Sequence, residues 1–247
     1  VPDFKAGQFL TLGLPLESKI VNRAYSIASS PDNKKFFEFV IRWVRRPLPG
    51  RLTSLLFNAK VGDKISWAKP AGNLTINDTL PSGEKDTRRI VCIGGGTGLA
   101  PFVSFAQHLH DTNDKREVVV LHGASYVDEL SYKQLLTDLE NDSIDKGKDK
   151  WNFKYRAAIS RPEEWTNRAW NGHKGRIEQF LRSNDAGKSP LEELVGEKIT
   201  KDNTMFYVCG WQGTIDGTMD YLKNKNFVTE KNKRDDGSYE VKFESYG

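Results

Sequence analysis

The chain has 247 residues, of which 37% are hydrophobic and 28% are charged, with a formal net charge of +4. This length can bury a substantial core and favours two domains over one. It contains no apolar run near the roughly 20 residues that span a bilayer, no signal peptide at its start and no charge excess that would predict nucleic-acid binding.

The cysteines and histidines exclude several kinds of site. Cys92 and Cys209 are too few for a disulfide framework or an iron–sulfur cluster, so we expect a reducing, cytoplasmic compartment. His108 and His110 are two residues apart and do not share a helix face, so no metal site is predicted. The small basic surplus fits an acidic protein partner, whose encounter it would accelerate, or simply solubility.

The first third of the chain is predicted to consist of short strands. Strand-like runs lie at residues 8–12, 23–27, 37–44 and 61–67, with turn-forming residues at 29–33 and a candidate short helix at 52–57. Many short strands with little helix indicate a small antiparallel barrel. Because the chain lacks an initiator Met and opens abruptly, we expect the natural chain to start earlier.

The pattern changes after a polar linker at residues 81–87. Predicted strands at 90–93, 118–122, 153–159, 205–208 and 239–243 alternate with predicted helices at 99–110, 131–140 and 216–222. This alternation indicates a mostly parallel sheet covered on both faces. We therefore predict a barrel domain over residues 1–84 and an α/β domain over residues 85–247, with the charged runs 142–149 and 229–237 as exposed loops.

A glycine-rich stretch, GGGTGLAPF from Gly94 to Phe102, follows the first strand of the α/β domain. It lacks the Gly-Lys-Ser/Thr of a P-loop and the spacing of the Rossmann fingerprint. A glycine turn whose N–H groups face a diphosphate remains, and Pro101 suits the first turn of the helix that follows. A tight turn without a ligand is the alternative.

Five motifs in one order resemble the ferredoxin–NADP⁺ reductase family. They are Arg23-Ala24-Tyr25-Ser26, Gly94 to Pro101, Ser160-Arg161, Gly175-Arg176 and Cys209-Gly210. The resemblance extends over residues 6–246, and the bacterial ferredoxin/flavodoxin–NADP⁺ reductases are most similar. It implies an FAD-binding antiparallel barrel and an NADP(H)-binding α/β domain, with nicotinamide and flavin meeting at their interface.

For FAD, the resemblance implies that Arg23 pairs with the diphosphate and Tyr25 packs beside the isoalloxazine. Ser26 would lie near flavin N5, the atom that exchanges hydride. A guanidinium can grip phosphate oxygens with two hydrogen bonds, and a hydroxyl can donate or accept. The other implied FAD contacts are Ala24, Val40, Ile41, Arg42, Trp43, Gly50, Arg51, Leu52, Thr53, Ser54, Thr97 and Tyr246.

For NADP(H), the resemblance implies contacts from the glycine turn and from an arginine cluster that would hold the 2′-phosphate. Cys209 would lie against nicotinamide C4, Glu244 would exchange protons with solvent, and Tyr246 would stack over the flavin or the adenine. The implied NADP(H) contacts are Gly95, Gly96, Thr97, Gly98, Ser160, Arg161, Arg168, Arg176, Cys209, Gly210 and Trp211.

These observations predict a monomeric FAD enzyme that transfers electrons between NADP(H) and an acidic carrier, ferredoxin or flavodoxin. Ser26, Cys209 and Glu244 are the expected catalytic residues. One alternative is an NAD(P)H reductase component that supplies an oxygenase or reduces free flavin. Another is a non-catalytic NADP-binding regulatory protein.

Overall fold

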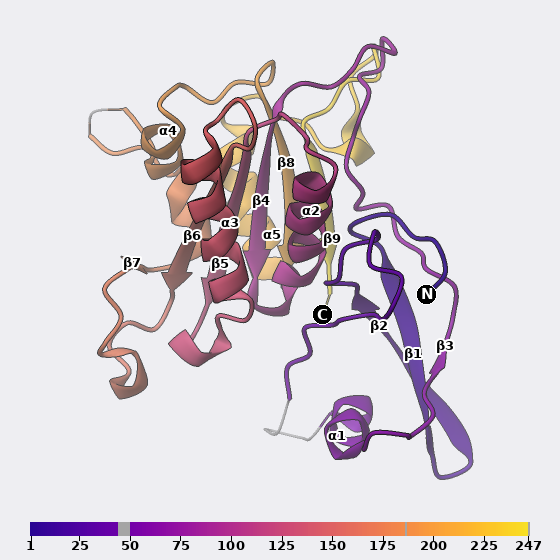
Figure 1. Cartoon of the computed structure of the whole chain (residues 1–247). Helices are drawn as coiled ribbons and strands as arrows, with labels where there is room; N and C mark the ends of the chain where they lie inside the picture. Colours follow the sequence, from indigo (N-terminus) through magenta and orange to yellow (C-terminus); the bar gives the residue numbers. More distant parts are fainter. Residues whose placement is uncertain (44–49, 186, 247) are drawn as a thin grey trace.

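A computed structural model describes residues 1–43, 50–185 and 187–246. Within this part of the chain the polypeptide forms a small antiparallel sheet, drawn in indigo and purple in Figure 1, beside a larger parallel sheet flanked by helices. The N-terminal third of the chain contributes the first sheet, and the rest contributes the second.

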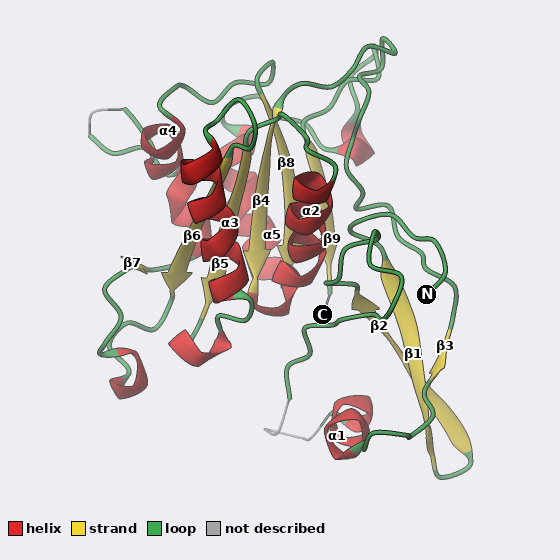
Figure 2. Cartoon of the chain, in the orientation of Figure 1, coloured by secondary structure: helices red, strands yellow, loops and turns green. Residues whose placement is uncertain are grey.

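The small sheet has the order β2-β1-β3. Strand β1 (Phe9–Leu16) pairs antiparallel with β2 (Lys19–Ser26), from Phe9 opposite Ser26 to Leu16 opposite Lys19. Strand β3 (Ser66–Trp67) pairs with the other edge of β1, and helix α1 (Arg51–Asn58) lies near the end of this sheet (Figure 2). The antiparallel architecture predicted for this region is therefore present.

Two predicted strands of this region are shorter or missing. Of residues 37–43, only Phe39 pairs, through an isolated bridge to Ile27, and residue 44 lies outside the described residues. In the run 61–67 only the last two residues are strand. The alternating apolar residues Phe37, Phe39 and Ile41 line an apolar hollow of the small sheet. Alternation alone does not supply a neighbouring strand for hydrogen bonds.

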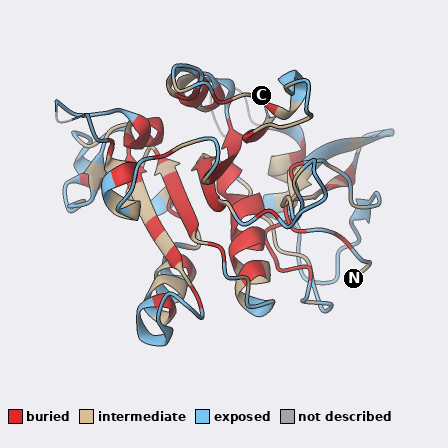
Figure 3. Cartoon of the chain, turned by 90° about the horizontal axis from the view of Figure 1, so that it is seen from above, coloured by how far each residue is buried: buried red, intermediate tan, exposed pale blue. Residues whose placement is uncertain are grey.

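The large sheet is parallel throughout, in the order β7-β6-β5-β4-β8-β9. Its strands are β4 (Arg89–Gly95), β5 (Val118–Ala124), β6 (Phe153–Ile159), β7 (His173–Lys174), β8 (Thr204–Gly210) and β9 (Val241–Ser245). The central strands are almost entirely buried (Figure 3), as expected for a sheet that is covered on both faces.

Helices cover both faces of this sheet, as predicted (Figure 1). One face carries α2 (Ala100–Asp111) and α3 (Lys133–Lys146), and the other carries α5 (Gln212–Lys223) and α4 (Pro190–Val195). Short 3-10 turns lie at η1 (Gly96–Leu99), η2 (Val127–Glu129), η3 (Trp165–Asn167), η4 (Ile177–Leu181) and η5 (Glu230–Asn232). Helix α3 extends to Lys146, so the run 142–149 begins as helix, and the prediction of a loop was wrong there.

The strand order reverses beside β4. The chain moves outward from β4 to β7 on one side and then returns to add β8 and β9 on the other side. In open parallel sheets a crevice forms where the order reverses, outside the carboxyl ends of the strands. This topology directs attention to the ends of β4, β8 and β9.

One hydrophobic cluster joins the N-terminal part of the chain to the parallel sheet, while Leu10 and Leu12 of the small sheet belong to a separate cluster. Phe102 and Phe105 of α2 pack in the same buried cluster as Ala6, Ala28 and Leu74 from the N-terminal part. The Ser104 hydroxyl donates a 2.8 Å hydrogen bond to the Ser29 carbonyl oxygen. Helix α2 therefore attaches one sheet to the other.

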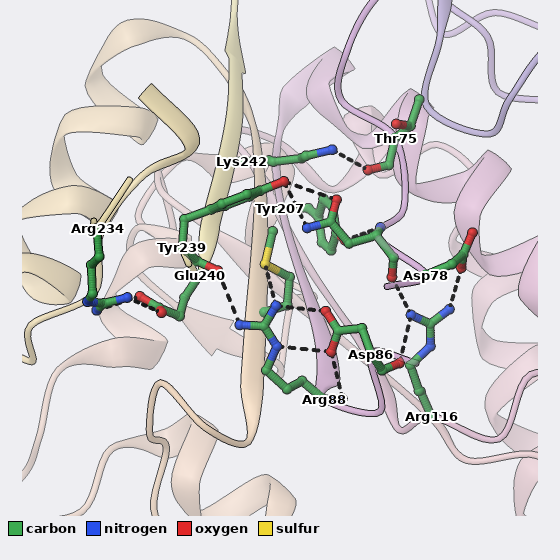
Figure 4. A network of polar contacts seen from close by, with 12 residues as sticks. Thr75, Asp78, Asp86, Arg88, Arg116, Tyr207, Arg234, Tyr239, Glu240 and Lys242 are labelled. Carbon is green, nitrogen blue, oxygen red and sulfur yellow. Dashed lines mark hydrogen bonds and ion pairs between the residues drawn. The ribbon is translucent and has the colours of Figure 1, made fainter. Parts of the chain in front are cut away.

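The connection between the sheets is also fastened by polar contacts (Figure 4). The Asn77 N–H donates to the buried Tyr207 hydroxyl at 2.8 Å, and the Arg116 guanidinium donates to the Asn77 carbonyl oxygen at 2.7 Å. Arg88 forms a 2.7 Å ion pair with Asp86, which is 1% exposed. The two ends of this connection are thus held in place, whereas residues 81–85 of the expected linker are exposed.

Within the described residues, no helix is long and apolar enough to cross a membrane. Nor do His, Cys, Asp and Glu side chains of this part of the chain form a group of three that would hold a metal ion.

Candidate functional site

A hollow of about 630 Å³ lies between the small sheet and the carboxyl ends of the parallel strands. From the small sheet it is lined by residues of β2, and from the parallel sheet by the glycine turn and the end of β9. Twelve predicted residues line it: Ala24, Tyr25, Ser26, Val40, Ile41, Arg42, Thr53, Gly96, Thr97, Trp211, Glu244 and Tyr246. Motifs far apart in the sequence therefore converge on one space.

The β2 residues reach the hollow because β2 ends there. Tyr25 and Ser26 are the last two residues of the strand, and the Tyr25 ring is held edge-on by Phe39 at 6.5 Å between ring centroids. Burial raises the pKa of Tyr25, so its hydroxyl stays protonated. Arg23 does not line the hollow, and its guanidinium donates to the Asn22 carbonyl oxygen at 2.8 Å.

The start of helix α1 brings one predicted residue to the hollow. Thr53 lines it and also donates a hydrogen bond to the Gly50 carbonyl oxygen at 3.3 Å. Leu52 is buried, and Trp43 stacks on Phe57 with 5.1 Å between ring centroids. The predicted residues near α1 that do not line the hollow are Trp43, Gly50, Arg51, Leu52 and Ser54.

The glycine turn forms the opposite wall. It runs from the end of β4 into η1 and α2, with Pro101 in the first turn of α2 as predicted. Gly96 has φ of +57°, and a Cβ built on it would meet nothing within 4 Å, so the backbone here is open to a ligand. By contrast, a Cβ on Gly95 would lie 2.7 Å from the Thr214 hydroxyl oxygen, so the turn packs closely against α5.

Cys209 is the penultimate residue of β8 and lies in register with Gly94 of β4 and Glu244 of β9. Its side chain is fully buried, and burial raises the pKa of the thiol well above its ordinary value, so it remains a neutral thiol. Cys209 does not line the hollow itself. Tyr246 does, and its hydroxyl lies 2.6 Å from where a Cβ on Gly98 would stand.

Glu244 supplies a titratable carboxyl group to the hollow. One carboxylate oxygen lies 3.7 Å from the position of a Cβ on Gly72, a residue of the N-terminal part. Burial raises the pKa of Glu244 above its ordinary value, because the charged form loses hydration there. The group therefore takes up a proton at a higher pH than a free glutamate.

A second hollow of about 290 Å³ adjoins the first, at the carboxyl ends of β5 and β6. Ser160 and Arg176 line it, as do Arg42, Gly95, Gly96 and Trp211 of the predicted set. The Gly175 N–H donates to the Ile159 carbonyl oxygen at 2.9 Å, which holds Arg176 beside Ser160. The Arg176 guanidinium is paired with the buried Glu178 carboxylate.

Two arginines predicted for the same cluster lie elsewhere. The Arg161 guanidinium donates to the Tyr126 hydroxyl at 2.8 Å and covers that ring, and Arg168 follows η3 on the surface. Neither lines either hollow. The polar excursion between β6 and β7 has no periodic pattern, so the direction of these side chains could not be predicted from the sequence.

Several residues that line the hollows were not predicted from the sequence. Phe9, Asp128, Glu129, Ser131 and Ser245 line the larger hollow, and Ser125 and Thr214 line the smaller one. Asp128, Glu129 and Ser125 follow β5 directly. The rule that ligands bind beyond the carboxyl ends of parallel strands would have identified these three.

The residues present fit a pair of dinucleotides. The larger hollow combines aromatic walls for a planar ring with hydroxyls from Ser26, Thr53 and Thr97, and the open backbone at Gly96 admits phosphate oxygens. The smaller hollow offers Ser160 and Arg176, a donor pair suited to a phosphate group.

Comparisons with known proteins agree with this geometry. The family model described as oxidoreductase FAD-binding domain matches residues 2–76, and the model described as oxidoreductase NAD-binding domain matches residues 92–220. The chain is 30% identical over 238 residues to a ferredoxin–NADP reductase of Azotobacter vinelandii, which covers 96% of this chain and 84% of the relative.

A second relative is a flavodoxin/ferredoxin–NADP reductase of Buchnera aphidicola, 26% identical over 243 residues, covering 95% of this chain and 85% of the relative. Among solved structures, a ferredoxin NADP⁺ reductase from Neisseria gonorrhoeae with bound FAD and NADP matches with a TM-score of 0.73. That match covers 98% of this chain and 87% of the other at 23% identity, and it establishes the fold.

Proposed function

The chain belongs to the ferredoxin–NADP reductase family of oxidoreductases, and we propose that it transfers electrons between NADP(H) and a ferredoxin or flavodoxin by means of FAD. One observation carries this proposal: Ser26 of the small sheet lines the same hollow as Thr97 and Glu244 of the parallel sheet. Bound FAD would supply hydride exchange with nicotinamide and single-electron exchange with a carrier protein.

We propose that each of the two parts of the chain binds one of the two dinucleotides. Residues 1–84 would hold FAD, with Tyr25 and Ser26 against the ring and Thr53 towards the phosphates. Residues 85–247 would hold the nicotinamide dinucleotide along the glycine turn. Support comes from the two adjoining hollows, which follow the carboxyl edge of the parallel sheet.

Three side chains would serve the reacting end of the larger hollow. Ser26 would present a hydroxyl that donates or accepts a hydrogen bond. Glu244 would hold or release a proton, as its raised pKa favours. Cys209 would remain a neutral thiol that fixes the depth of the nicotinamide site behind Tyr246, and its role would be positional.

We further propose that the enzyme prefers NADP(H) to NAD(H). Arg176 lies beside Ser160 in the smaller hollow, and an arginine there favours a 2′-phosphate over a free ribose hydroxyl. Since Cys92 and Cys209 are both free and buried, we also infer a reducing, cytoplasmic compartment.

Cofactor content and coenzyme choice test the proposal together. The purified chain, reconstituted with FAD, should be yellow and should reduce an artificial acceptor with NADPH far better than with NADH. Arg176→Gln should raise the KM for NADPH roughly tenfold, as expected for the loss of a charged phosphate contact, and should leave the KM for NADH within about twofold. A chain that retains no flavin would overturn the proposal.

The acceptor separates the proposed activity from the alternative of a reductase component that supplies an oxygenase. Turnover with ferredoxin or flavodoxin at micromolar KM supports the proposal. Rapid reduction of free flavin together with no turnover of either carrier protein would favour the alternative.

A further inference from the structure

The two hollows meet at a passage that four of the described residues share. Arg42, Gly96, Glu129 and Trp211 line both hollows. A ligand that has one end beside Arg176 and the other beside Ser26 must cross this passage. Its width and charge therefore bear directly on how a nicotinamide dinucleotide enters.

An ion pair spans the passage. The Arg42 guanidinium lies 3.0 Å from one carboxylate oxygen of Glu129, and the other oxygen accepts the Ser125 N–H at 3.2 Å. Arg42 belongs to the N-terminal part and Glu129 to η2 of the parallel-sheet part. The pair thus joins the two parts of the chain across the route between the hollows.

The other two described residues of the passage leave room for a ligand. A Cβ built on Gly96 would meet nothing within 4 Å, and Trp211 is exposed. The Arg42 side chain is 54% exposed and the Glu129 side chain 27% exposed. An ion pair in water contributes little to stability, because hydration and salt compete with it. Separating Arg42 from Glu129 should therefore require little free energy.

We propose that the Arg42–Glu129 ion pair is a displaceable latch, and that the diphosphate of the nicotinamide dinucleotide opens it by replacing the Glu129 carboxylate on the Arg42 guanidinium. The inference rests on the proposed function, because it assumes that such a dinucleotide crosses the passage. Arg42 then acts as a phosphate-binding residue, and Glu129 acts as its competitor.

The chemistry of the two groups supports an exchange. A guanidinium pairs with phosphate oxygens through two parallel hydrogen bonds, as it does with a carboxylate. A diphosphate brings more negative charge than one carboxylate and so competes well for Arg42. The Ser125 N–H keeps the Glu129 carboxylate in place after release, ready to recapture Arg42 when the ligand leaves.

Binding measurements on four variants test the latch. The variants are Glu129→Gln, Arg42→Gln, their combination, and Glu140→Gln as a matched control. Glu140 forms a 2.7 Å ion pair with Arg156 and lines neither hollow. The Kd for NADP⁺ is measured by calorimetry on the FAD-loaded protein at low salt, with thermal unfolding followed in parallel.

The latch predicts opposite effects for its two members. Glu129→Gln should tighten NADP⁺ binding roughly three- to tenfold, and Arg42→Gln should weaken it roughly tenfold. Adding Glu129→Gln to Arg42→Gln should change the Kd by less than about twofold, because no guanidinium remains to be freed. Glu140→Gln should leave the Kd unchanged.

Two results would overturn the latch in distinguishable ways. If the wild type binds NADP⁺ but both single variants stay within twofold of it and only the unfolding temperature falls, the pair is a structural strut and the latch is wrong. If the wild type retains FAD but binds no NADP⁺, the proposed function and the latch fail together.

Discussion

Gly98 has no room for a side chain. A Cβ there would lie 2.1 Å from the Cys209 carbonyl oxygen and 2.6 Å from the Tyr246 hydroxyl. We therefore expect Gly98→Ala to push β8 or the C-terminal segment aside. The unfolding temperature should fall, and NADPH-dependent turnover should fall at least tenfold.

Gly213→Ala is the control for Gly98→Ala. Its Cβ would meet only the Arg176 guanidinium, at an ordinary 3.5 Å, at the start of α5. The unfolding temperature of this variant should be unchanged or higher, since alanine favours helix over glycine. If Gly98→Ala behaves like Gly213→Ala, the close approach of Cys209 and Tyr246 is not required.

Glu244 makes the stability of the protein depend on pH. Its pKa is raised by burial in the folded chain, so the folded state binds a proton more tightly than the unfolded state does. The stability from this group is full below its unfolded pKa of about 4.3 and is lost as the pH rises through the folded pKa. Glu244→Gln should therefore be more stable than the wild type at neutral pH.

Unfolding temperatures of the wild type and of Glu244→Gln, measured from about pH 4 to pH 8, test this sign. The difference should be near zero at the acid end and should grow in favour of the variant as the pH rises. A difference that is constant with pH would mean that the carboxyl does not ionise against a burial penalty.

At the scale of single residues, some side chains singled out in strands line the larger hollow, whereas Arg23 and Cys209 do not. Tyr25 and Ser26 reach the hollow because they end a strand, and Glu244 because it faces Cys209 across a parallel pair. Arg161 and Arg168 belong to an irregular excursion, where no period fixes a direction. Glu129 follows the end of β5, but its pairing with Arg42 depends on how the two parts of the chain sit together.

Among the elements, the segment between the two sheets is attached to the parallel sheet partly through one buried hydroxyl group. Tyr207 of β8 accepts the Asn77 N–H, and its side chain is fully buried. Tyr207→Phe leaves that N–H unpaired and should cost about 1–3 kcal/mol of unfolding free energy. Urea denaturation measures this loss.

Tyr239→Phe is the companion variant. Its hydroxyl binds the Asn77 side chain at 3.0 Å, where the residue is only half-buried, and the amide can turn to water instead. Tyr239→Phe should therefore lower the free energy of unfolding by less than about 1 kcal/mol. Equal losses in the two variants would contradict a special role for the backbone contact.

The elements of the parallel sheet were predicted well, because each is a long apolar or periodic run. The strand at 153–159 matches β6 (Phe153–Ile159), and the helix at 99–110 is shifted by one residue in α2 (Ala100–Asp111). The strand predicted at 37–44 was wrong over residues 37–43, where Phe39 forms a single bridge. Side-chain alternation reports which face is apolar, whereas a strand also needs a neighbouring backbone.

For the molecule as a whole, charge is divided unevenly between its two parts. Residues 1–84 contain 12 Lys and Arg against 7 Asp and Glu, and residues 85–247 contain 25 against 26. If the carrier protein is acidic, its encounter with the N-terminal part should be accelerated by attraction. We expect kcat/KM for ferredoxin or flavodoxin to fall roughly tenfold between about 20 and about 200 mM salt.

Steady-state kinetics with a neutral quinone as the acceptor provide the comparison, because attraction plays no part in that encounter. The quinone reaction should keep its kcat/KM over the same range of salt. A carrier reaction that is equally indifferent to salt would contradict electrostatic steering.

The packing of α2 has a practical consequence for engineering. Phe102 and Phe105 pack in one cluster with Ala6, Ala28 and Leu74, so apolar contacts join the two halves of the molecule. We expect an excised nicotinamide-binding half to expose apolar side chains of this cluster and to aggregate. In a chimera with the flavin-binding half of a homologue, we expect the two halves to pack poorly where they meet. Coenzyme preference is therefore better altered by point substitutions around Ser160 and Arg176 than by exchanging halves between homologues.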